Sequence, residues 1–347
     1  MSVRYAITRL VDRVDLTEEE AQAAMREVVE GEATPSQISA FVIGLRMKGE
    51  TAEEIAGLAR VMREYATRVD AGPEVVDLVG TGGDNSCSFN ISTISALVVA
   101  AAGAKIAKHG NRGVTSGCGS ADILEALGIA IDLGPDEVAS SVDRSGFGFM
   151  FAPMYHPAMR HAVPVRREIG VRTVFNLLGP ITNPAGATRQ LTGVAVQDMI
   201  ERIAQVLGRL GSRRALVVHG DDGIDEISIS ATTRGFLVEN GHIRPVELTP
   251  EALGFSRTPR EAIQCGSIED NLRMARSVLD GERSPARDVV LLNAGAGLFV
   301  AGLADDIRAG VELAARLIDS GEARSKLEQV RQVSADLKSE QAGAAAS

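Results

Sequence analysis

A short apolar segment that runs directly into a cluster of glycines constrains the fold of this chain more than any other feature. Residues 75–79 are mostly apolar and precede Gly80-Thr81-Gly82-Gly83-Asp84, and a second apolar segment at residues 94–102 has the length of a helix. A strand, a glycine turn and a helix start bring backbone N–H groups together around an anion. Glycine also removes the Cβ atoms that would keep a phosphate away. The sequence therefore predicts an α/β unit with a phosphate site at this turn.

The polar residues after the glycines favour a phosphate site, and an ordinary tight turn is the alternative. Ser88, Asn90, Ser92 and Thr93 place hydroxyl and amide groups at the positive end of the helix dipole. The turn has neither the Gly-Lys-Ser/Thr ending of a P-loop nor the Gly-x-Gly-x-x-Gly pattern of dinucleotide-binding proteins. The choice between a phosphate site and an ordinary turn depends on the neighbouring motifs.

Charge and cysteine content exclude several classes of protein. The 347 residues carry 36 Lys and Arg against 46 Asp and Glu, a net charge of −10, which argues against a nucleic-acid or membrane-binding surface. The three cysteines include no Cys-x-x-Cys pair, so a reducing cytosol fits better than a disulfide framework or a zinc site. No signal-peptide core and no apolar run of about 20 residues is evident. We expect a cytoplasmic protein with no nucleic-acid or membrane partner.

The first 70 residues read as a helical unit. Apolar residues recur at helical spacing, and Pro35 suits a first helical position. Such a unit has to bury its apolar face against the rest of the chain or against a second subunit. Helix starts are marked by three capping boxes, formed by Thr17 with Glu20, Thr34 with Gln37, and Thr51 with Glu54.

From residue 75 short apolar strands alternate with helices, which predicts a mostly parallel sheet flanked by helices. The expected strands are residues 75–79, 104–107, 130–133, 147–151, 191–196 and 215–218, with a hairpin over 236–248 that turns at Asn240-Gly241. Residues 157–184 return to a basic, helix-like pattern. We expect a helical domain of residues 1–70 with about 157–184, an α/β domain of 71–156 with about 185–338, and a frayed tail at 339–347.

Polar groups follow two further expected strands. Lys108-His109-Gly110-Asn111-Arg112 ends one of them, and parallel strand ends lie side by side, so Lys108 and the glycine turn are expected to face one ligand. An acidic run, residues 221–226, ends another strand and lacks the spacing of an EF-hand. Carboxylates facing a phosphate site suit Mg²⁺ bound between them and a diphosphate, because acid alone would repel the phosphate.

A basic stretch in the helical return has two interpretations. Its face is either exposed to solvent or holds an anionic second substrate, because a guanidinium matches a carboxylate with two hydrogen bonds. The glycine-containing run 293–297 is interpreted as close helix packing. No covalent catalyst is evident. The basic stretch contains His156, Arg160, His161, Arg166, Arg167 and Arg172.

Several long motifs, taken together, resemble the anthranilate phosphoribosyltransferase family. They occur in the family's order and cover nearly the whole chain, to about residue 330. The motifs are 77–84 (DLVGTGGD), 89–93 (FNIST), 108–112 (KHGNR), 119–128 (GSADILEALG), 156–160 (HPAMR), 165–173 (VRREIGVRT), 175–180 (FNLLGP), 182–184 (TNP) and 225–228 (DEIS).

The resemblance implies transfer of phosphoribosyl from 5-phosphoribosyl 1-diphosphate (PRPP) to the amine of anthranilate in tryptophan biosynthesis. It also implies a homodimer formed largely through the helical domains. Ser92, Asp225 and Glu226 are expected to hold two Mg²⁺ ions, and Gly80, Asn111 and Arg166 to contact anthranilate. The residues expected around PRPP are Gly80, Gly83, Asp84, Ser88, Asn90, Ile91, Ser92, Thr93, Lys108, His109, Gly110, Asn111, Arg112, Gly113, Val114, Thr115, Ser116 and Ser120.

One departure from the family pattern and two alternative functions accompany this interpretation. Gly117-Cys118 stands where the family often has Lys-Ser, and the loss of that lysine is expected to loosen the loop over the diphosphate. A pyrimidine-nucleoside phosphorylase is similar in fold, but it needs neither the acidic pair nor the 166–180 stretch. A non-catalytic nucleic-acid-binding relative is opposed by the net charge of −10 and the scarcity of aromatic residues.

Overall fold

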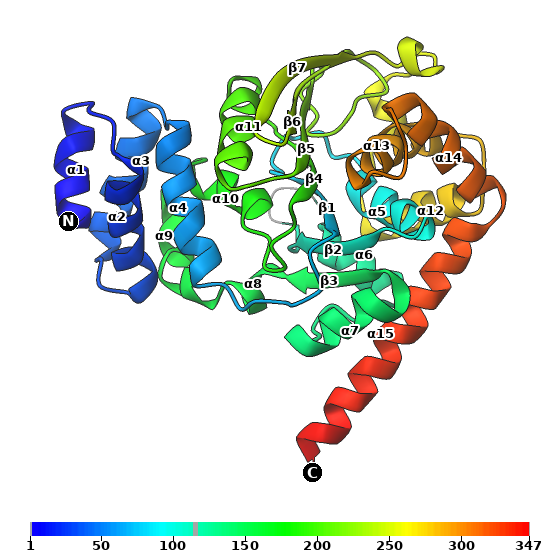
Figure 1. The fold of residues 1–347 in the computed structure, drawn as a ribbon, viewed down its shortest axis with the longest axis horizontal. Helices are drawn as coiled ribbons and strands as arrows, with labels where there is room; N and C mark the ends of the chain where they lie inside the picture. The colour runs from blue at the N-terminus through cyan, green and yellow to red at the C-terminus, as the bar shows by residue number, and fades with distance from the viewer. Residues whose placement is uncertain (1, 114–116, 347) are drawn as a thin grey trace.

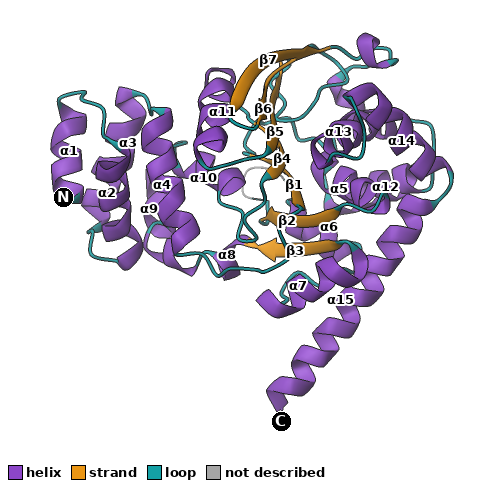
Figure 2. Ribbon diagram, in the orientation of Figure 1, coloured by secondary structure: helices purple, strands orange, loops and turns teal. Residues whose placement is uncertain are grey.

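The protein combines a helical bundle with an α/β body. The computed structural model describes residues 2–113 and 117–346. The bundle lies at the left of Figure 1, and the sheet lies between two layers of helices to its right (Figures 1 and 2). The bundle is formed by α1 (Val3–Val11), α2 (Glu18–Glu30), α3 (Pro35–Lys48) and α4 (Ala52–Glu64).

The predicted helix starts in the bundle are confirmed. In α4 the Thr51 hydroxyl accepts from the Glu54 N–H at 3.2 Å, and the Glu54 carboxylate accepts from the Thr51 N–H at 2.8 Å. The same reciprocal pair begins α2 and α3, and Pro35 opens α3. Each cap satisfies two backbone N–H groups that have no partner within the helix.

A seven-stranded, mostly parallel sheet forms the centre of the α/β body, as predicted. The strand order is β3-β2-β1-β4-β5-β6-β7; the first five are parallel, and β6 and β7 form the predicted antiparallel hairpin. The strands are β1 (Val75–Gly80), β2 (Lys105–Gly110), β3 (Phe147–Phe151), β4 (Arg189–Gly193), β5 (Arg214–Gly220), β6 (Thr233–Glu239) and β7 (His242–Leu248).

The strand expected at residues 130–133 is wrong. Ile131 and Leu133 are buried, but the Ala130 N–H donates to the Ser334 hydroxyl of the C-terminal helix at 3.2 Å and not to a strand. Gly134 and Pro135 then begin α7 (Pro135–Ser145). This apolar run is buried by helix contact, a case that periodicity cannot separate from a short buried strand.

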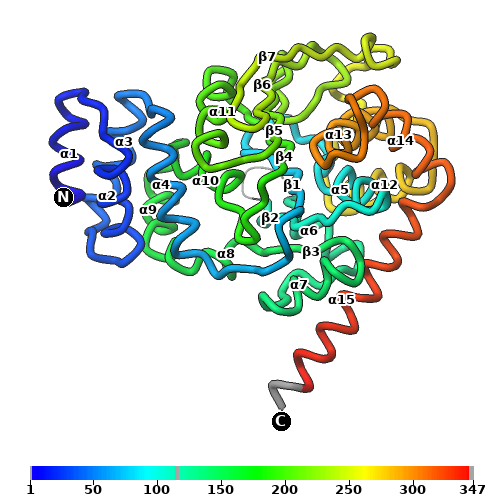
Figure 3. Tube along the Cα trace, in the orientation of Figure 1, coloured from blue at the N-terminus to red at the C-terminus, as the bar shows by residue number. Residues whose placement is uncertain are grey.

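Helices cover both faces of the sheet, and strand residues alternate between the two buried layers. In β5, Leu216 and Val218 join the cluster under α5, α13 and α14, whereas Ala215 and Val217 join the cluster under α10 and α11. Figure 3 shows the same two layers along the chain trace. The covering helices are α5 (Ile91–Ala101), α6 (Ser120–Ala126), α10 (Phe175–Ile181), α11 (Ile200–Arg209), α12 (Ile268–Leu279), α13 (Pro285–Ala301) and α14 (Ile307–Asp319).

The segment after β3 returns to the helical bundle. Val165 and Phe175 lie in the same buried cluster as Phe41 and Leu58 of the bundle, and that cluster continues to the α11 face of the sheet. The returning helices therefore fix the bundle beside the sheet edge at which the strands end. The segment contains α8 (Ala152–Tyr155), a 3₁₀ turn (Pro157–His161) and α9 (Val163–Ile169); further 3₁₀ turns are Gln197–Met199, Glu251–Leu253 and Arg260–Ile263.

The C-terminal segment, where we expected a frayed tail at residues 339–347, is helical as far as Ala346. Helix α15 (Glu322–Ala346) runs obliquely from the right of Figure 1 to the bottom of the view and extends past the body. Leu337 is buried against the α7 layer, and Lys338 pairs with Asp132 at 2.6 Å, which holds the helix at residue 338. The alanine-rich end continues it because alanine has the highest helix propensity. No described helix is long and apolar enough to cross a membrane.

Candidate functional site

The carboxyl ends of four strands meet at one edge of the sheet, beside the returning helical segment. The chain runs from β1 outward through β2 to β3, and then from β4 to β5 on the other side of β1. Ligands of open α/β sheets bind where the strand order reverses in this way. The strands around this point end in glycine, at Gly80, Gly110, Gly193 and Gly220.

Two of these glycines are required by the close approach of the acidic loop. A Cβ atom at Gly193 would overlap the main-chain carbonyl of Asp225, and one at Gly80 would lie 2.5 Å from Asp225 Oδ2. The loop after β5 therefore crosses directly over the ends of β1 and β4. Any side chain at either glycine would push the carboxylates away from the glycine turn.

The acidic pair, Asp225 and Glu226, accepts hydrogen bonds from the N–H groups that the sequence predicts to bind an anion. Asp225 Oδ2 accepts from the Gly82 N–H at 2.6 Å, and Glu226 Oε1 accepts from the Ser92 N–H at 3.1 Å, at the start of α5. Asp84 joins them, since its Oδ2 accepts from the Asp225 N–H at 3.4 Å. The structure therefore brings the glycine turn, the helix start and the acidic loop together.

These carboxylates carry more negative charge than their surroundings neutralise. Burial, reinforced by the Asp84 carboxylate, raises the pKa of Asp225 to about 7. Burial and the neighbouring Asp225 raise the pKa of Glu226 well above its usual value, against the opposing effect of Lys108. Buried carboxylates of this kind are stabilised either by a proton or by a cation.

A divalent ion fits this donor set. Ser92, Asp225 and Glu226 offer a hydroxyl and two carboxylates, which are hard oxygen ligands of the kind that Mg²⁺ prefers. Within residues 2–113 and 117–346, no three His, Cys, Asp or Glu side chains are arranged to hold a metal by themselves. An ion at this position therefore needs oxygens from water or from a bound phosphate, as is usual for Mg²⁺.

Lys108 lies beneath the site. Its amine is buried and donates to Leu78 O and, at 3.4 Å, to Ser92 Oγ. Burial lowers its pKa, while the carboxylates of Asp77 and Glu226 oppose that shift. Its charge therefore acts on the site through the helix start. The sequence-based expectation that Lys108 faces a ligand stays a prediction.

Asp77 is the buried counter-charge of Lys108, within β1. Its carboxylate accepts from Asn183 Nδ2 at 2.7 Å and from the His109 N–H at 3.4 Å. Burial raises the pKa of Asp77 to about 6, although the Lys108 charge acts in the opposite direction. Asn183 also donates to Ala107 O, so this network ties β1, β2 and the end of the helical return together.

The residues before α5 are held partly by a helix from the far end of the chain. Asn90 exchanges two hydrogen bonds with Asn271 of α12: its N–H donates at 3.3 Å and its Oδ1 accepts at 2.7 Å. Ser88 accepts from the Ser86 hydroxyl. Ile91 and Thr93 are fully buried, and the Thr93 hydroxyl has no partner among the described residues.

The loop after β2 folds around Asp122. The Asp122 carboxylate accepts from the Gly113 and Gly119 N–H groups, and Arg112 pairs with Asp122 at 2.8 Å and with Glu125 at 2.9 Å. The Arg112 guanidinium is therefore paired with two carboxylates of α6.

Other residues of this loop lie at its start and end. The Ser120 hydroxyl donates to Asn111 O at 3.3 Å. Cys118 is buried, and burial raises the pKa of its thiol to about 12, consistent with a packing role. The expected ligand contacts at Val114, Thr115 and Ser116 lie outside the described residues.

The helical return supplies a basic side to the site. Arg172 donates through Nη1 to the carbonyls of Gly82 at 2.7 Å and Gly83 at 2.8 Å, which fastens the glycine turn to this segment. Arg166 lies 6.0 Å from the ring of Phe175 and has no hydrogen bond or ion pair with any described residue. Its guanidinium is therefore available for an anion.

The remaining basic residues divide between the solvent and the interior. Arg160 and Arg167 are exposed, and His161 packs against Gly31 of the bundle. His156 is buried 5.0 Å from the ring of His109, whose Nδ1 donates to Gly179 O at 3.1 Å. Burial lowers the pKa of His156 to about 4. Burial and the neighbouring His156 ring lower the pKa of His109 to about 3. Both rings are neutral at pH 7.

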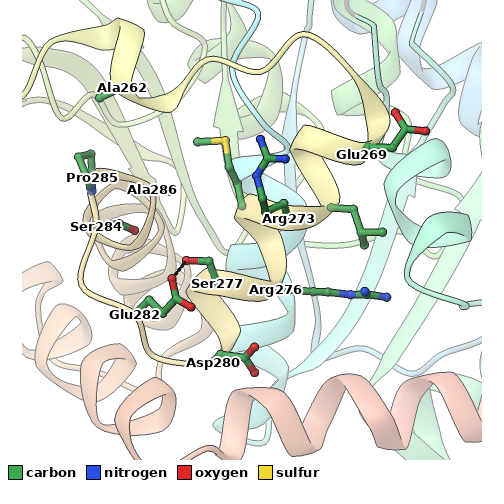
Figure 4. Close-up of a pocket in the computed structure, with 12 residues that line it drawn as sticks. Ala262, Glu269, Arg273, Arg276, Ser277, Asp280, Glu282, Ser284, Pro285 and Ala286 are labelled. Carbon is green, nitrogen blue, oxygen red and sulfur yellow. Dashed lines mark hydrogen bonds between the residues drawn. The ribbon is translucent and has the colours of Figure 1, made fainter.

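A separate open groove lies beside α12. It encloses about 680 Å³ beside α12 and the turn into α13, and it includes none of the residues assigned to the site (Figure 4). Ser277 and Glu282, which line it, are hydrogen-bonded to each other at 2.7 Å. Nothing in its lining matches the chemistry of the strand ends.

Sequence reasoning missed four buried polar residues that hold the site. Asp77 interrupts an apolar strand and Asn293 interrupts an apolar helix, and these breaks in pattern were the available signals. The run 293–297 does pack closely, as predicted, with Gly295 against Val311. Asn183 and Asn271 gave no comparable signal.

Comparison with known proteins agrees with this architecture. Residues 4–66 match the helical bundle domain of a glycosyl transferase family, and residues 72–324 match the a/b domain of such a family. The chain is thus a two-domain glycosyltransferase of this class. An anthranilate phosphoribosyltransferase from Symbiobacterium thermophilum is 54% identical over 98% of this chain and 100% of its own length. The chain belongs to the anthranilate phosphoribosyltransferase family.

Solved structures extend the agreement to three dimensions. The crystal structure of anthranilate phosphoribosyltransferase from Thermus thermophilus matches with a TM-score of 0.89 and 45% identity, over 95% of this chain and 99% of that one. The enzyme from Saccharomyces cerevisiae in complex with PRPP and Mg matches with a TM-score of 0.84 and 26% identity, over 96% of this chain and 98% of that one. The predicted family is confirmed.

Proposed function

We propose that this protein transfers the phosphoribosyl group of PRPP to the amine of anthranilate and releases diphosphate. The observation that carries the proposal is the position of the acidic pair. Asp225 and Glu226 lie on the N–H groups of Gly82 and Ser92, where an anionic ligand also belongs. Two carboxylates and a diphosphate share such a place only with divalent cations between them.

The PRPP side is formed by the glycine turn, the start of α5 and the loop after β2. We infer that Gly80, Gly83 and Asp84 border the diphosphate, and that Ser88 and Asn90 supply further polar contacts. When bound, two Mg²⁺ ions at Ser92, Asp225 and Glu226 would neutralise the departing diphosphate oxygens. The chain's own part is to aim preorganised N–H groups at those oxygens, which costs no rearrangement during the reaction.

The anthranilate side is formed where the helical return faces the strand ends. Arg166 has no carboxylate partner of its own, and we infer that it pairs with the anthranilate carboxylate while Gly80 and Asn111 border the ring. An aromatic amine is neutral at pH 7 and needs no base before it attacks ribose C1. Orientation is therefore the main contribution of this side. The buried imidazoles of His109 and His156, whose pKa values are lowered by burial, add no charge of their own to this side.

The division into two domains is part of the proposal. We infer that residues 1–70 with about 157–184 act as one helical unit and that this unit pairs two subunits. Large apolar side chains are exposed on it, including Val11 at 74% and Met47 at 72%. Light scattering should give a dimer mass, and Val11→Glu with Met47→Glu should reduce it to a monomer. A monomeric wild type would remove the dimer from the proposal.

A fluorescence assay tests the activity. Protein, PRPP and Mg²⁺ are mixed with anthranilate, and loss of anthranilate fluorescence is followed. Consumption that requires both PRPP and Mg²⁺ supports the proposal. A pyrimidine nucleoside with inorganic phosphate serves as the competing substrate pair. Turnover of that pair without turnover of anthranilate would replace the proposed function with phosphorolysis.

A further inference from the structure

A buried asparagine in α13 holds the acidic loop from behind. Asn293 is fully buried in the middle of α13. Its Oδ1 accepts from the Ile227 N–H at 2.9 Å, and its Nδ2 donates to Ile227 O at 3.0 Å and to Val289 O at 2.9 Å. Ile227 directly follows Glu226, so one side chain fixes both backbone polar groups next to the acidic pair.

A second buried asparagine holds the opposite half of the site in the same way. Asn271 of α12 is fully buried and binds both the N–H and the side-chain oxygen of Asn90, at 3.3 and 2.7 Å. Asn90 precedes α5, whose Ser92 N–H meets the Glu226 carboxylate. Asn293 therefore holds the acidic loop, and Asn271 holds the start of α5, and these are the two segments that meet at the site.

The two asparagines lie on consecutive helices that pack together. Helix α13 packs against both α5 and α12 on one side of the sheet (Figure 1). In α13, Gly297 packs against Leu78 of β1 and Val99 of α5 so closely that a Cβ atom would lie 2.8 Å from Val99. This scaffold fixes the distance between the acidic loop and the helix start.

We propose that Asn271 and Asn293 are positioning residues that set the spacing between the acidic pair and the start of α5, and hence the affinity of the site for divalent cations and PRPP. The amide group suits this task because it donates and accepts at once and carries no charge into the acidic surroundings. Supporting residues behind metal ligands typically contribute about 10–100-fold in metal affinity or activity. This inference rests on the proposed function for the identity of the ligands.

Substitutions of the two asparagines should affect different ligands. Asn293→Ala frees the acidic loop and should weaken binding of Mn²⁺ alone, measured by electron paramagnetic resonance of the free ion, by about 10-fold or more. The KM for anthranilate should change by less than about twofold. Asn271→Ala should raise the KM for PRPP by about 10-fold with a smaller change in Mn²⁺ binding.

Ser141→Ala is the matched control. Ser141 is as buried and also donates to a backbone carbonyl, Phe147 O at 2.7 Å, but at the start of β3, away from the site. It should lower the melting temperature and leave Mn²⁺ binding unchanged. If Asn293→Ala does not fold, Asn293→Ser retains one hydrogen bond and takes its place.

The outcomes distinguish this inference from the proposed function. A folded Asn293 variant with wild-type Mn²⁺ affinity overturns the inference even if the wild type transfers phosphoribosyl. Equal weakening for every ligand, parallel to the loss of stability, also overturns it. A wild type that binds Mn²⁺ but consumes no anthranilate overturns the proposed function, while weakened Mn²⁺ binding by Asn293→Ala would still support the positioning role.

Discussion

The acidic and basic sides of the site differ in whether every charged side chain has a protein partner. On the α/β side, the carboxylates of Asp225 and Glu226 accept from backbone N–H groups, and Lys108 is buried with Leu78 O and Ser92 as partners. On the helical side, Arg172 donates to the Gly82 and Gly83 carbonyls, whereas Arg166 lies 6.0 Å from the Phe175 ring and has no polar partner among the described residues. Charges with protein partners are fixed in place, whereas a charge without one is free to bind substrate. This difference is the reason why we propose diphosphate chemistry on one side and acceptor binding on the other.

Removing the charge of the acidic pair should have the largest effect. Asp225→Asn combined with Glu226→Gln should lower Mg²⁺-dependent kcat by about 10³-fold or more, because charge stabilisation at the leaving group is lost. The free energy of unfolding without Mg²⁺ should stay the same or rise, because two poorly neutralised buried carboxylates are gone. Steady-state kinetics and urea unfolding measure both.

Asp221→Asn is the control for this prediction. Asp221 lies in the same loop but pairs with Arg234 at 3.0 Å, away from the glycine turn. It should leave kcat within about twofold. Retained turnover of the double variant in the presence of a chelator would remove the metal from the proposed function.

Arg166→Ala should have the next largest effect, confined to one substrate. Loss of a charge-assisted pair of about 1.5–3 kcal/mol should raise the KM for anthranilate about 10–150-fold. The KM for PRPP should change little, because the two sides act on different substrates. Arg167→Ala, at the exposed neighbouring position, is the matched control. Equal losses for both substrates would contradict the division between the two sides.

Arg172 tests whether the two sides are physically joined. Arg172→Ala removes both hydrogen bonds to the carbonyls of Gly82 and Gly83. We expect the KM for PRPP to rise about 10-fold, since one charged donor is lost from the glycine turn. Arg172→Lys should recover only part of this, because an ammonium group lacks the planar fork of a guanidinium. Full recovery by lysine would show that charge alone is required.

The buried histidines should give the smallest effect, measured as stability against pH. The pKa of His156 is lowered to about 4 in the folded protein, so below its unfolded value of about 6.5 the unfolded chain binds more protons. The stability that this residue contributes is present above pH 6.5 and is lost as the pH falls. Between pH 7 and 5.5 the wild type should lose about 1 kcal/mol more than His156→Gln in urea unfolding.

The comparison between the variant and the wild type isolates this contribution. Asp77 and Asp225, whose pKa values are raised, add stability as the pH falls and oppose the histidines in the total curve. His242, exposed on β7, provides the control substitution His242→Gln. If the stability of His156→Gln depends on pH in the same way as that of the wild type, the prediction is contradicted.

Local signals made much of this site predictable from the sequence. The glycine turn, the start of α5 and the capping boxes depend on residues within a few positions of one another. The meeting of Asp225 with Gly82 followed from a general property of parallel sheets, that their strand ends share one edge. The run at residues 130–133 misled because a short apolar segment fits a strand and a buried loop equally well.

Long-range partners explain what the sequence could not provide. Asn271 meets Asn90 across 181 positions, and Asn293 meets Ile227 across 66. The local sequence around an asparagine in a helix does not indicate such a distant partner. The burial of Lys108 follows from its pairing with Asp77 and Leu78 on the adjacent strand, which is set by the sheet register.

The glycines that end β1 and β4 limit where this site can be altered by mutagenesis. Because the acidic loop crosses Gly80 and Gly193 without room for a Cβ atom, mutagenesis of these strand ends would disturb the loop itself. The surroundings of Arg166 and Phe175 belong to short helices that are separate from those strand ends. Libraries that aim at a different aromatic amine should therefore randomise the helical side and leave the sheet edge intact.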